Sequence, residues 1–90
     1  MTRHILITGA SRGLGRALAL HLAQSEKADL VLLGRDAVAL GETAEAVVAH
    51  GGTARCFEAD VRDREALHLV AQAIGPLDGL VANAGVSGLT

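Results

Sequence analysis

The chain has 90 residues, 50% of them hydrophobic and 20% charged, with a formal net charge of −2 at pH 7. This composition predicts one soluble globular domain at most, and its balanced, scattered charges argue against binding nucleic acid or an acidic membrane surface. No apolar stretch near the N-terminus is long enough for a secretory signal or a membrane span, so we expect a cytoplasmic protein.

The first part of the chain alternates strand and helix patterns. Residues 3–8 form a β-branched and leucine-rich run that ends at a glycine, which predicts a buried strand. Apolar residues at helical spacing predict a helix over 14–23. The continuous apolar run 30–33 predicts a second strand that is covered on both faces, as in a parallel sheet.

The rest of the chain repeats this alternation. Asp36 and Asp63 stand where helical patterns begin and are expected to be N-caps, and glycines follow both helices. The predicted elements are a helix over 37–49, a strand over 54–59, a helix over 64–74 and a strand over 79–82.

The order βαβαβαβ predicts an α/β fold. Each connection has the length of one crossover helix, so the strands should be parallel and the crossovers right-handed. We expect the first half of a Rossmann-type doubly wound sheet, with strand order 3-2-1-4 and the third helix alone on its face. One helix cannot cover four strands, and the fourth strand offers an open edge. The isolated chain is therefore predicted to be marginally stable or a homo-oligomer.

The turn between the first strand and the first helix carries three glycines. Gly9 allows a sharp turn, Gly13 lets the backbone approach a phosphate, and Gly15 lets the helix pack closely. The helix N-terminus presents free N–H groups to an anion, and Ser11 either adds a hydroxyl or caps the helix. Glycines alone also fit a purely structural turn. Leu14 followed by glycine excludes a P-loop, whereas an S-adenosylmethionine site stays open in principle.

Three motifs in order resemble the short-chain dehydrogenases/reductases. They are Thr-Gly-x-x-x-Gly-x-Gly over 8–15, Asp60-Val61 after the third predicted strand, and Asn83-Ala84-Gly85 after the fourth. The resemblance implies an NAD(P)(H)-dependent oxidoreductase that transfers hydride between the nicotinamide cofactor and a small alcohol or carbonyl substrate. It covers essentially the whole chain and does not identify the substrate.

The resemblance also implies roles for single residues. Asp60 would accept a hydrogen bond from the adenine amino group, although a turn or cap aspartate is the alternative, and the backbone of Val61 would contact the adenine. Asn83, beside Ala84, would tie the central strands together, and Gly85 would leave room for the cofactor ribose. The family usually has two asparagines where this chain has alanine and then asparagine, so the network there departs from the pattern.

The end of the second strand favours NADP(H) over NAD(H). An acidic residue about twenty positions after the glycines binds the ribose hydroxyls in NAD sites and repels a 2′-phosphate. Gly34 holds that position here and Arg35 follows, so Arg35 and Arg12 can converge on one phosphate. The competing interpretation is that Asp36 reaches back to the ribose and that Arg35 is only a solvated surface residue.

The resemblance implies catalysis by a tyrosine, a lysine four positions later and a serine. The chain has no tyrosine, its only lysine is Lys27, and Ser87 comes too early. We therefore expect residues 1–90 to be a dinucleotide-binding half-domain that lacks the catalytic half and is inactive by itself. The alternative is a non-catalytic nucleotide-binding or interaction module.

No residue is assigned to catalysis or to a metal. The four histidines show no ligand-like spacing. Cys56 lies in an apolar-alternating run and is expected to be a small, buried, unreactive residue.

Overall fold

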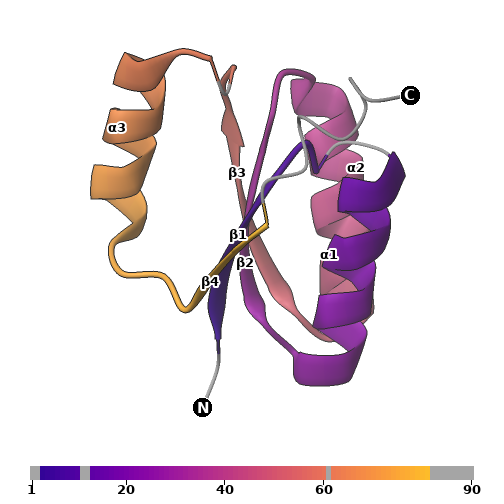
Figure 1. Cartoon of the computed structure of the whole chain (residues 1–90). Helices are drawn as coiled ribbons and strands as arrows, with labels where there is room; N and C mark the ends of the chain where they lie inside the picture. The colour runs from indigo at the N-terminus through magenta and orange to yellow at the C-terminus, as the bar shows by residue number, and fades with distance from the viewer. Residues whose placement is uncertain (1–2, 11–12, 61, 82–90) are drawn as a thin grey trace.

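The computed structural model describes residues 3–10, 13–60 and 62–81. Strands and helices alternate through these residues (Figure 1), and the predicted βαβαβαβ order is confirmed. The elements are β1 His4–Thr8, α1 Gly13–Glu26, β2 Asp29–Gly34, α2 Ala37–Ala49, β3 Thr53–Glu58, α3 Arg64–Ile74 and β4 Gly79–Val81.

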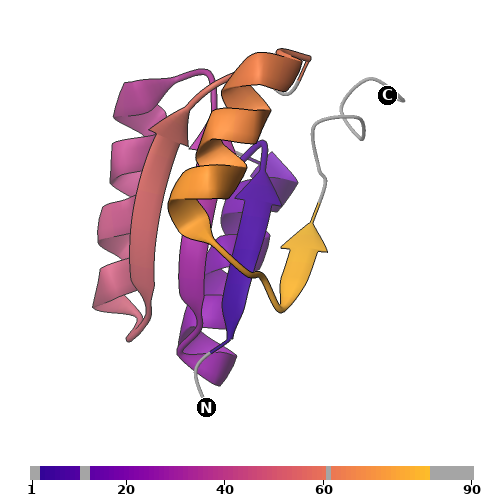
Figure 2. The same cartoon turned by 90° about the vertical axis from the view of Figure 1, so that its left-hand side faces the viewer.

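The strands form one parallel sheet in the order β3-β2-β1-β4, which confirms the predicted order. Ile7 at the centre of the sheet lies opposite Leu32 of β2 and Val81 of β4. The arrowheads of β3, β1 and β4 point to the same end of the molecule in Figure 2. The segments that follow the strands therefore begin at one edge of the sheet, its carboxyl edge.

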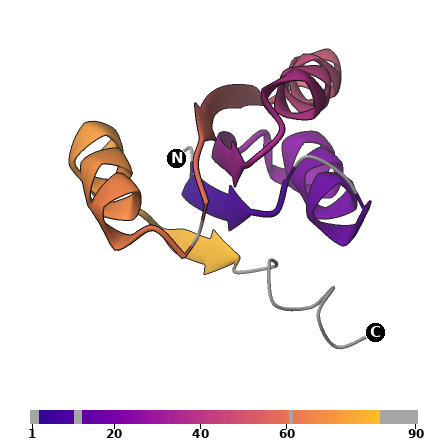
Figure 3. The ribbon, with the colours of Figure 1, turned by 90° about the horizontal axis from the view of Figure 1, so that it is seen from above.

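The helices cover the two faces of the sheet unequally. Helices α1 and α2 lie on one face, and α3 lies alone on the other (Figures 1 and 3), as the crossover argument predicted. None of the helices in the described part of the chain is both long and apolar enough to cross a membrane.

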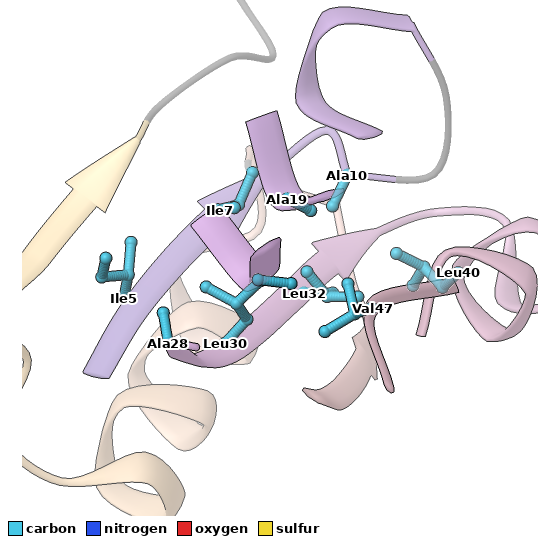
Figure 4. Close-up of a cluster of buried hydrophobic side chains, with 10 residues drawn as sticks. Ile5, Ile7, Ala10, Ala19, Ala28, Leu30, Leu32, Leu40 and Val47 are labelled. Carbon is cyan, nitrogen blue, oxygen red and sulfur yellow. The ribbon is translucent and has the colours of Figure 1, made fainter. Parts of the chain in front are cut away.

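Strand β2 is buried on both faces, as its unbroken apolar run predicted. Leu30 and Leu32 belong to the cluster beneath α1 and α2 (Figure 4). Val31 and Leu33 point the other way and pack with Ile74 of α3. These four side chains have no exposed surface, so the sheet has a continuous core along this strand.

The face that carries α3 is only partly covered. Leu6 of β1 packs against the cluster that contains Ile74 of α3, but Leu80 of the edge strand β4, which lies opposite Leu6, is 62% exposed. This exposure agrees with the expectation that one helix cannot cover four strands. The marginal stability or oligomerisation inferred from it stays a prediction.

Local chemistry explains where the helices begin and end. Asp36 and Asp63 are the N-caps of α2 and α3, and each accepts a hydrogen bond of 3.1 Å from the backbone N–H three residues on. Helix α1 continues to Glu26, beyond its predicted end at residue 23. The prediction missed the last residues because they are polar and exposed, so they do not appear in the apolar spacing. Lys27, with φ of 52°, follows it, and Gly75, with φ of 73°, ends α3.

The expectation that Cys56 is buried is wrong. Its side chain is exposed, because β3 is an edge strand that pairs with β2 alone. The Sγ atom lies beside α2, where it donates to the carbonyl oxygen of Leu40 at 3.5 Å. Partial desolvation raises the pKa of the thiol, which disfavours the reactive thiolate.

Candidate functional site

The chain segments that leave β1, β2 and β3 are tied together at the carboxyl edge of the sheet. The backbone N–H of Ala10 donates to the carbonyl of Leu33 at 3.3 Å, and that of Ala59 donates to the carbonyl of Gly34 at 2.9 Å. The turn after β1 therefore sits beside the end of β2, which sits beside the end of β3. In open α/β sheets this edge is where ligands bind.

Two glycines of the turn after β1 have backbone conformations that favour glycine. Gly9 and Gly13 have φ values of 64° and 62°, in the left-handed region that side chains disfavour. Gly13 opens α1, and among the described residues beyond its own helix turn a Cβ built on it would meet no atom within 4 Å. Gly15 is buried, whereas Leu14 is 53% exposed. The described residues thus leave the backbone at Gly13 uncovered, at the positive end of a helix dipole, which fits a phosphate.

The ends of β2 and β3 bring three charged side chains together. The Oδ2 atom of Asp60 lies 3.0 Å from Nη2 of Arg62 and 3.9 Å from Nη1 of Arg35. Both arginine side chains are largely exposed, at 79% and 73%, and Asp60 is 32% exposed. Two guanidinium groups therefore flank one carboxylate at this corner of the edge.

Arg62 controls the ionisation of Asp60. Its guanidinium donates from Nε to Oδ1 at 3.2 Å and from Nη2 to Oδ2 at 3.0 Å, and its backbone N–H donates to Oδ1 at 2.9 Å. These bonds lower the pKa of Asp60 to about 2, with the side-chain bonds of Arg62 as the largest cause and Arg35 as a minor one. The same pairing raises the pKa of Arg62. Asp60 is an anion at every physiological pH.

Asp36 has a structural task. Its Oδ1 atom accepts the hydrogen bond from the backbone N–H of Ala39 that caps α2. The sequence predicted this N-cap role for Asp36 and assigned the 2′-phosphate to Arg35 instead. A carboxylate engaged in a cap is less available to a ribose hydroxyl.

The described part of the chain holds half of the predicted site. The residues placed at or beside the carboxyl edge are Gly9, Gly13, Leu14, Gly15, Arg35 and Asp60. The predicted contacts of Ser11, Arg12, Val61, Asn83, Ala84 and Gly85 lie outside the described residues.

Sequence reasoning missed Arg62. The signal was available, because aspartate often accepts a hydrogen bond from the backbone two residues on and Arg62 stands at that spacing from Asp60. The bonds between them support the turn role that was the alternative for Asp60. They leave the adenine contact as a prediction.

Comparison with known proteins places the chain in one family. The family model described as short chain dehydrogenase matches residues 3–90. A 3-dehydrosphinganine reductase of Arabidopsis thaliana is 42% identical over 85 residues, which cover 93% of this chain and 25% of the relative. A ketoacyl reductase of a Nostoc species is 45% identical over 86 residues, covering 91% of this chain and 30% of the relative. The chain therefore spans between a quarter and a third of these relatives.

Solved structures share the fold. The L-sorbose reductase of Gluconobacter frateurii, complexed with NADPH and L-sorbose, superposes with a TM-score of 0.80 at 31% identity. The match covers 93% of this chain and 34% of that protein. A structure from Haemophilus influenza with bound NAD superposes with a TM-score of 0.75 at 29% identity, over 87% of this chain and 29% of that one. Both nicotinamide dinucleotides thus occur among the similar structures.

Proposed function

The chain belongs to the short chain dehydrogenase family, and from that premise we propose that residues 1–90 are a dinucleotide-binding half-domain whose carboxyl sheet edge holds NADP(H). The observation that carries the proposal is Gly13, which combines a φ of 62°, a place at the start of α1 and space over its Cα that no described residue fills. A phosphate needs that combination of close backbone approach and N–H donors.

The proposed activity is hydride transfer between the nicotinamide and an alcohol or carbonyl substrate. The cofactor supplies the hydride chemistry when it is bound. The residues of this chain bind and orient the dinucleotide: the start of α1 takes the pyrophosphate, and Asp60 takes the adenine amino group. The names of the relatives, a 3-dehydrosphinganine reductase and a ketoacyl reductase, support carbonyl compounds as the substrate class.

Arg35 supports NADP(H) as the preferred cofactor. It directly follows β2, its side chain is 73% exposed, and no carboxylate stands at the strand end, where Gly34 is. The carboxylate that comes next, Asp36, caps α2. A guanidinium at this position attracts a 2′-phosphate and binds it through paired N–H groups. The similar structures contain NADPH in one case and NAD in another, so the preference rests on the residues of this chain.

The test is a pair of titrations of the purified chain with NADPH and NADH. We expect NADPH to bind more tightly, and we expect Arg35→Asp to weaken NADPH more than NADH, because it replaces attraction to the 2′-phosphate by repulsion. Arg55→Asp, the same charge reversal at an exposed residue within β3, is the matched control. Tighter binding of NADH by the native chain would reject the preference. Failure to bind either nucleotide would reject the site.

The chain is proposed to bind the cofactor without reducing a carbonyl by itself. It contains no tyrosine, which the family uses to move the substrate proton. Oxidation of NADPH by the purified chain with a panel of ketones and aldehydes, above the rate without protein, would contradict this. The cytoplasmic location and the formation of oligomers stay predictions from the sequence.

A further inference from the structure

The carboxylate of Asp60, which is proposed to bind the adenine amino group, already accepts hydrogen bonds from another residue of the chain. Oδ1 of Asp60 accepts from the backbone N–H of Arg62 at 2.9 Å and from its Nε at 3.2 Å, and Oδ2 accepts from Nη2 at 3.0 Å. The two planar groups thus form a bidentate pair. A carboxylate offers about four acceptor positions, so Arg62 takes most of them. The Nη1 atom of Arg35 lies 3.9 Å from Oδ2 as well.

The side-chain hydrogen bonds of Arg62 and its backbone hydrogen bond differ in how easily they break. Its side chain is 79% exposed, and an ion pair at the protein surface contributes little to stability. Its backbone N–H, by contrast, belongs to the turn that the carbonyl of Asp60 closes by accepting from the N–H of Asp63 at 2.9 Å. The guanidinium can therefore leave while the backbone bond keeps the carboxylate oriented.

This inference rests on the proposed nucleotide site. We propose that the Arg62 side chain binds the Asp60 carboxylate in the free protein and that the adenine amino group displaces it. A guanidinium and an exocyclic amino group are both N–H donors, so they compete for the same oxygen atoms. In the free protein the Arg62 side chain pairs with the carboxylate and so lowers the affinity for adenine, while the backbone N–H of Arg62 keeps the carboxylate oriented. The side chain is thus a determinant of base specificity.

The base of the nucleotide isolates this competition from other effects of the charge. NADPH and its hypoxanthine analogue carry the same charge, but the analogue has a carbonyl oxygen where adenine has the amino group. At that position Asp60, an acceptor, can bind the amino group but not the carbonyl oxygen that replaces it. The ratio of the two dissociation constants therefore reports the contact at Asp60, whereas the loss of one positive charge affects both ligands alike.

The experiment measures this ratio for the native chain, for Arg62→Ala and for Arg64→Ala. Arg64→Ala removes an exposed guanidinium two residues further on and is the matched control. We expect Arg62→Ala to increase the preference for adenine over hypoxanthine by about two- to fivefold, which corresponds to the weak energy of an exposed ion pair. The control should leave the ratio unchanged. A thermal melt of each variant confirms that it is folded.

The outcomes separate this inference from the proposed function. If the native chain binds NADPH but Arg62→Ala leaves the ratio unchanged or reduces it, Arg62 does not compete with adenine and the inference fails alone. If Arg64→Ala increases the ratio equally, the effect is one of charge and the inference also fails. If the native chain binds neither nucleotide, both the proposed function and the inference fail.

Discussion

Replacing Gly13 by alanine tests the glycine turn, because the structure separates its two expected effects. The residue has φ of 62°, and the left-handed region costs an L-residue about 1–2 kcal/mol. The stiffer unfolded chain of the variant offsets about 0.4–1 kcal/mol of this. A Cβ on Gly13 would meet no atom of the described residues beyond its own helix turn within 4 Å, so no clash with them adds to the cost. The net loss of folding stability is on the order of 1 kcal/mol, which lowers the Tm by about 4–8 °C in a domain of this size.

The binding effect of Gly13→Ala is expected to be larger than its effect on stability. The Cβ would occupy the open space through which a phosphate approaches the start of α1, so we expect NADPH to bind at least about tenfold more weakly, the equivalent of one misplaced contact of about 1.4 kcal/mol. Thermal melts and NADPH titrations of the same preparations measure the two effects separately.

Gly75→Ala is the matched control for this pair of measurements. Gly75 also has positive φ, 73°, and open space around it, but it ends α3 and leads toward the beginning of β4, far from the carboxyl edge. We expect this variant to lose about 1–3 kcal/mol of stability because its backbone conformation is nearly restricted to glycine. Its affinity for NADPH should stay native. If Gly13→Ala loses stability but binds NADPH like the native chain, the phosphate does not lie over Gly13.

Three further predictions concern stability. Gly52→Ala should destabilise the chain by about 1–3 kcal/mol in urea unfolding, because the new Cβ would lie 2.9 Å from the Cβ of Ala23 and 3.2 Å from its Cα; an unchanged midpoint would contradict this close approach. Lys27→Gly should raise the stability by about 0.5–1 kcal/mol, because Lys27 has φ of 52°; a lower Tm would show that its side chain matters more than its backbone. The pKa of Asp60 is lowered from 3.8 to about 2 in the folded chain, mainly by Arg62, so the stability that this carboxylate adds is complete above its ordinary pKa and is lost as the pH falls from about 5 to 2. Arg62→Ala should reduce that acid-dependent fall in Tm, and identical pH profiles would refute the assignment.

The elements were predictable because each depends on local chemistry. Aspartate is a favoured N-cap wherever it precedes a helical pattern. The predicted N-caps Asp36 and Asp63 are both confirmed. The apolar run of β2 requires cover on both faces, and the sheet provides it. The end of α1 was less predictable, since exposed polar residues extend a helix without changing its apolar face.

Cys56 shows what periodicity leaves undetermined. Alternating apolar residues indicate which side of a strand faces a layer of helices, but they do not indicate how much of the strand that layer covers. Strand β3 lies at the edge of the sheet, so Cys56 faces α2 and is still exposed. The position of a strand in the sheet is a property of the whole chain, and local pattern does not contain it.

By itself the sequence determined the order of the elements, the parallel sheet and the places of Gly9, Gly13 and Arg35 at its carboxyl edge, because strand length, crossover length and glycine spacing are encoded locally. The tertiary structure alone decided how the charges at that edge pair. Asp60 and Arg35 are 25 positions apart in the chain, and only the adjacency of β2 and β3 brings the guanidinium to 3.9 Å from the carboxylate. Arg62 takes up the same carboxylate because the turn after β3 folds its backbone and side chain onto it. Such pairings arise from distance and orientation in space, which the spacing of residues along the chain does not fix.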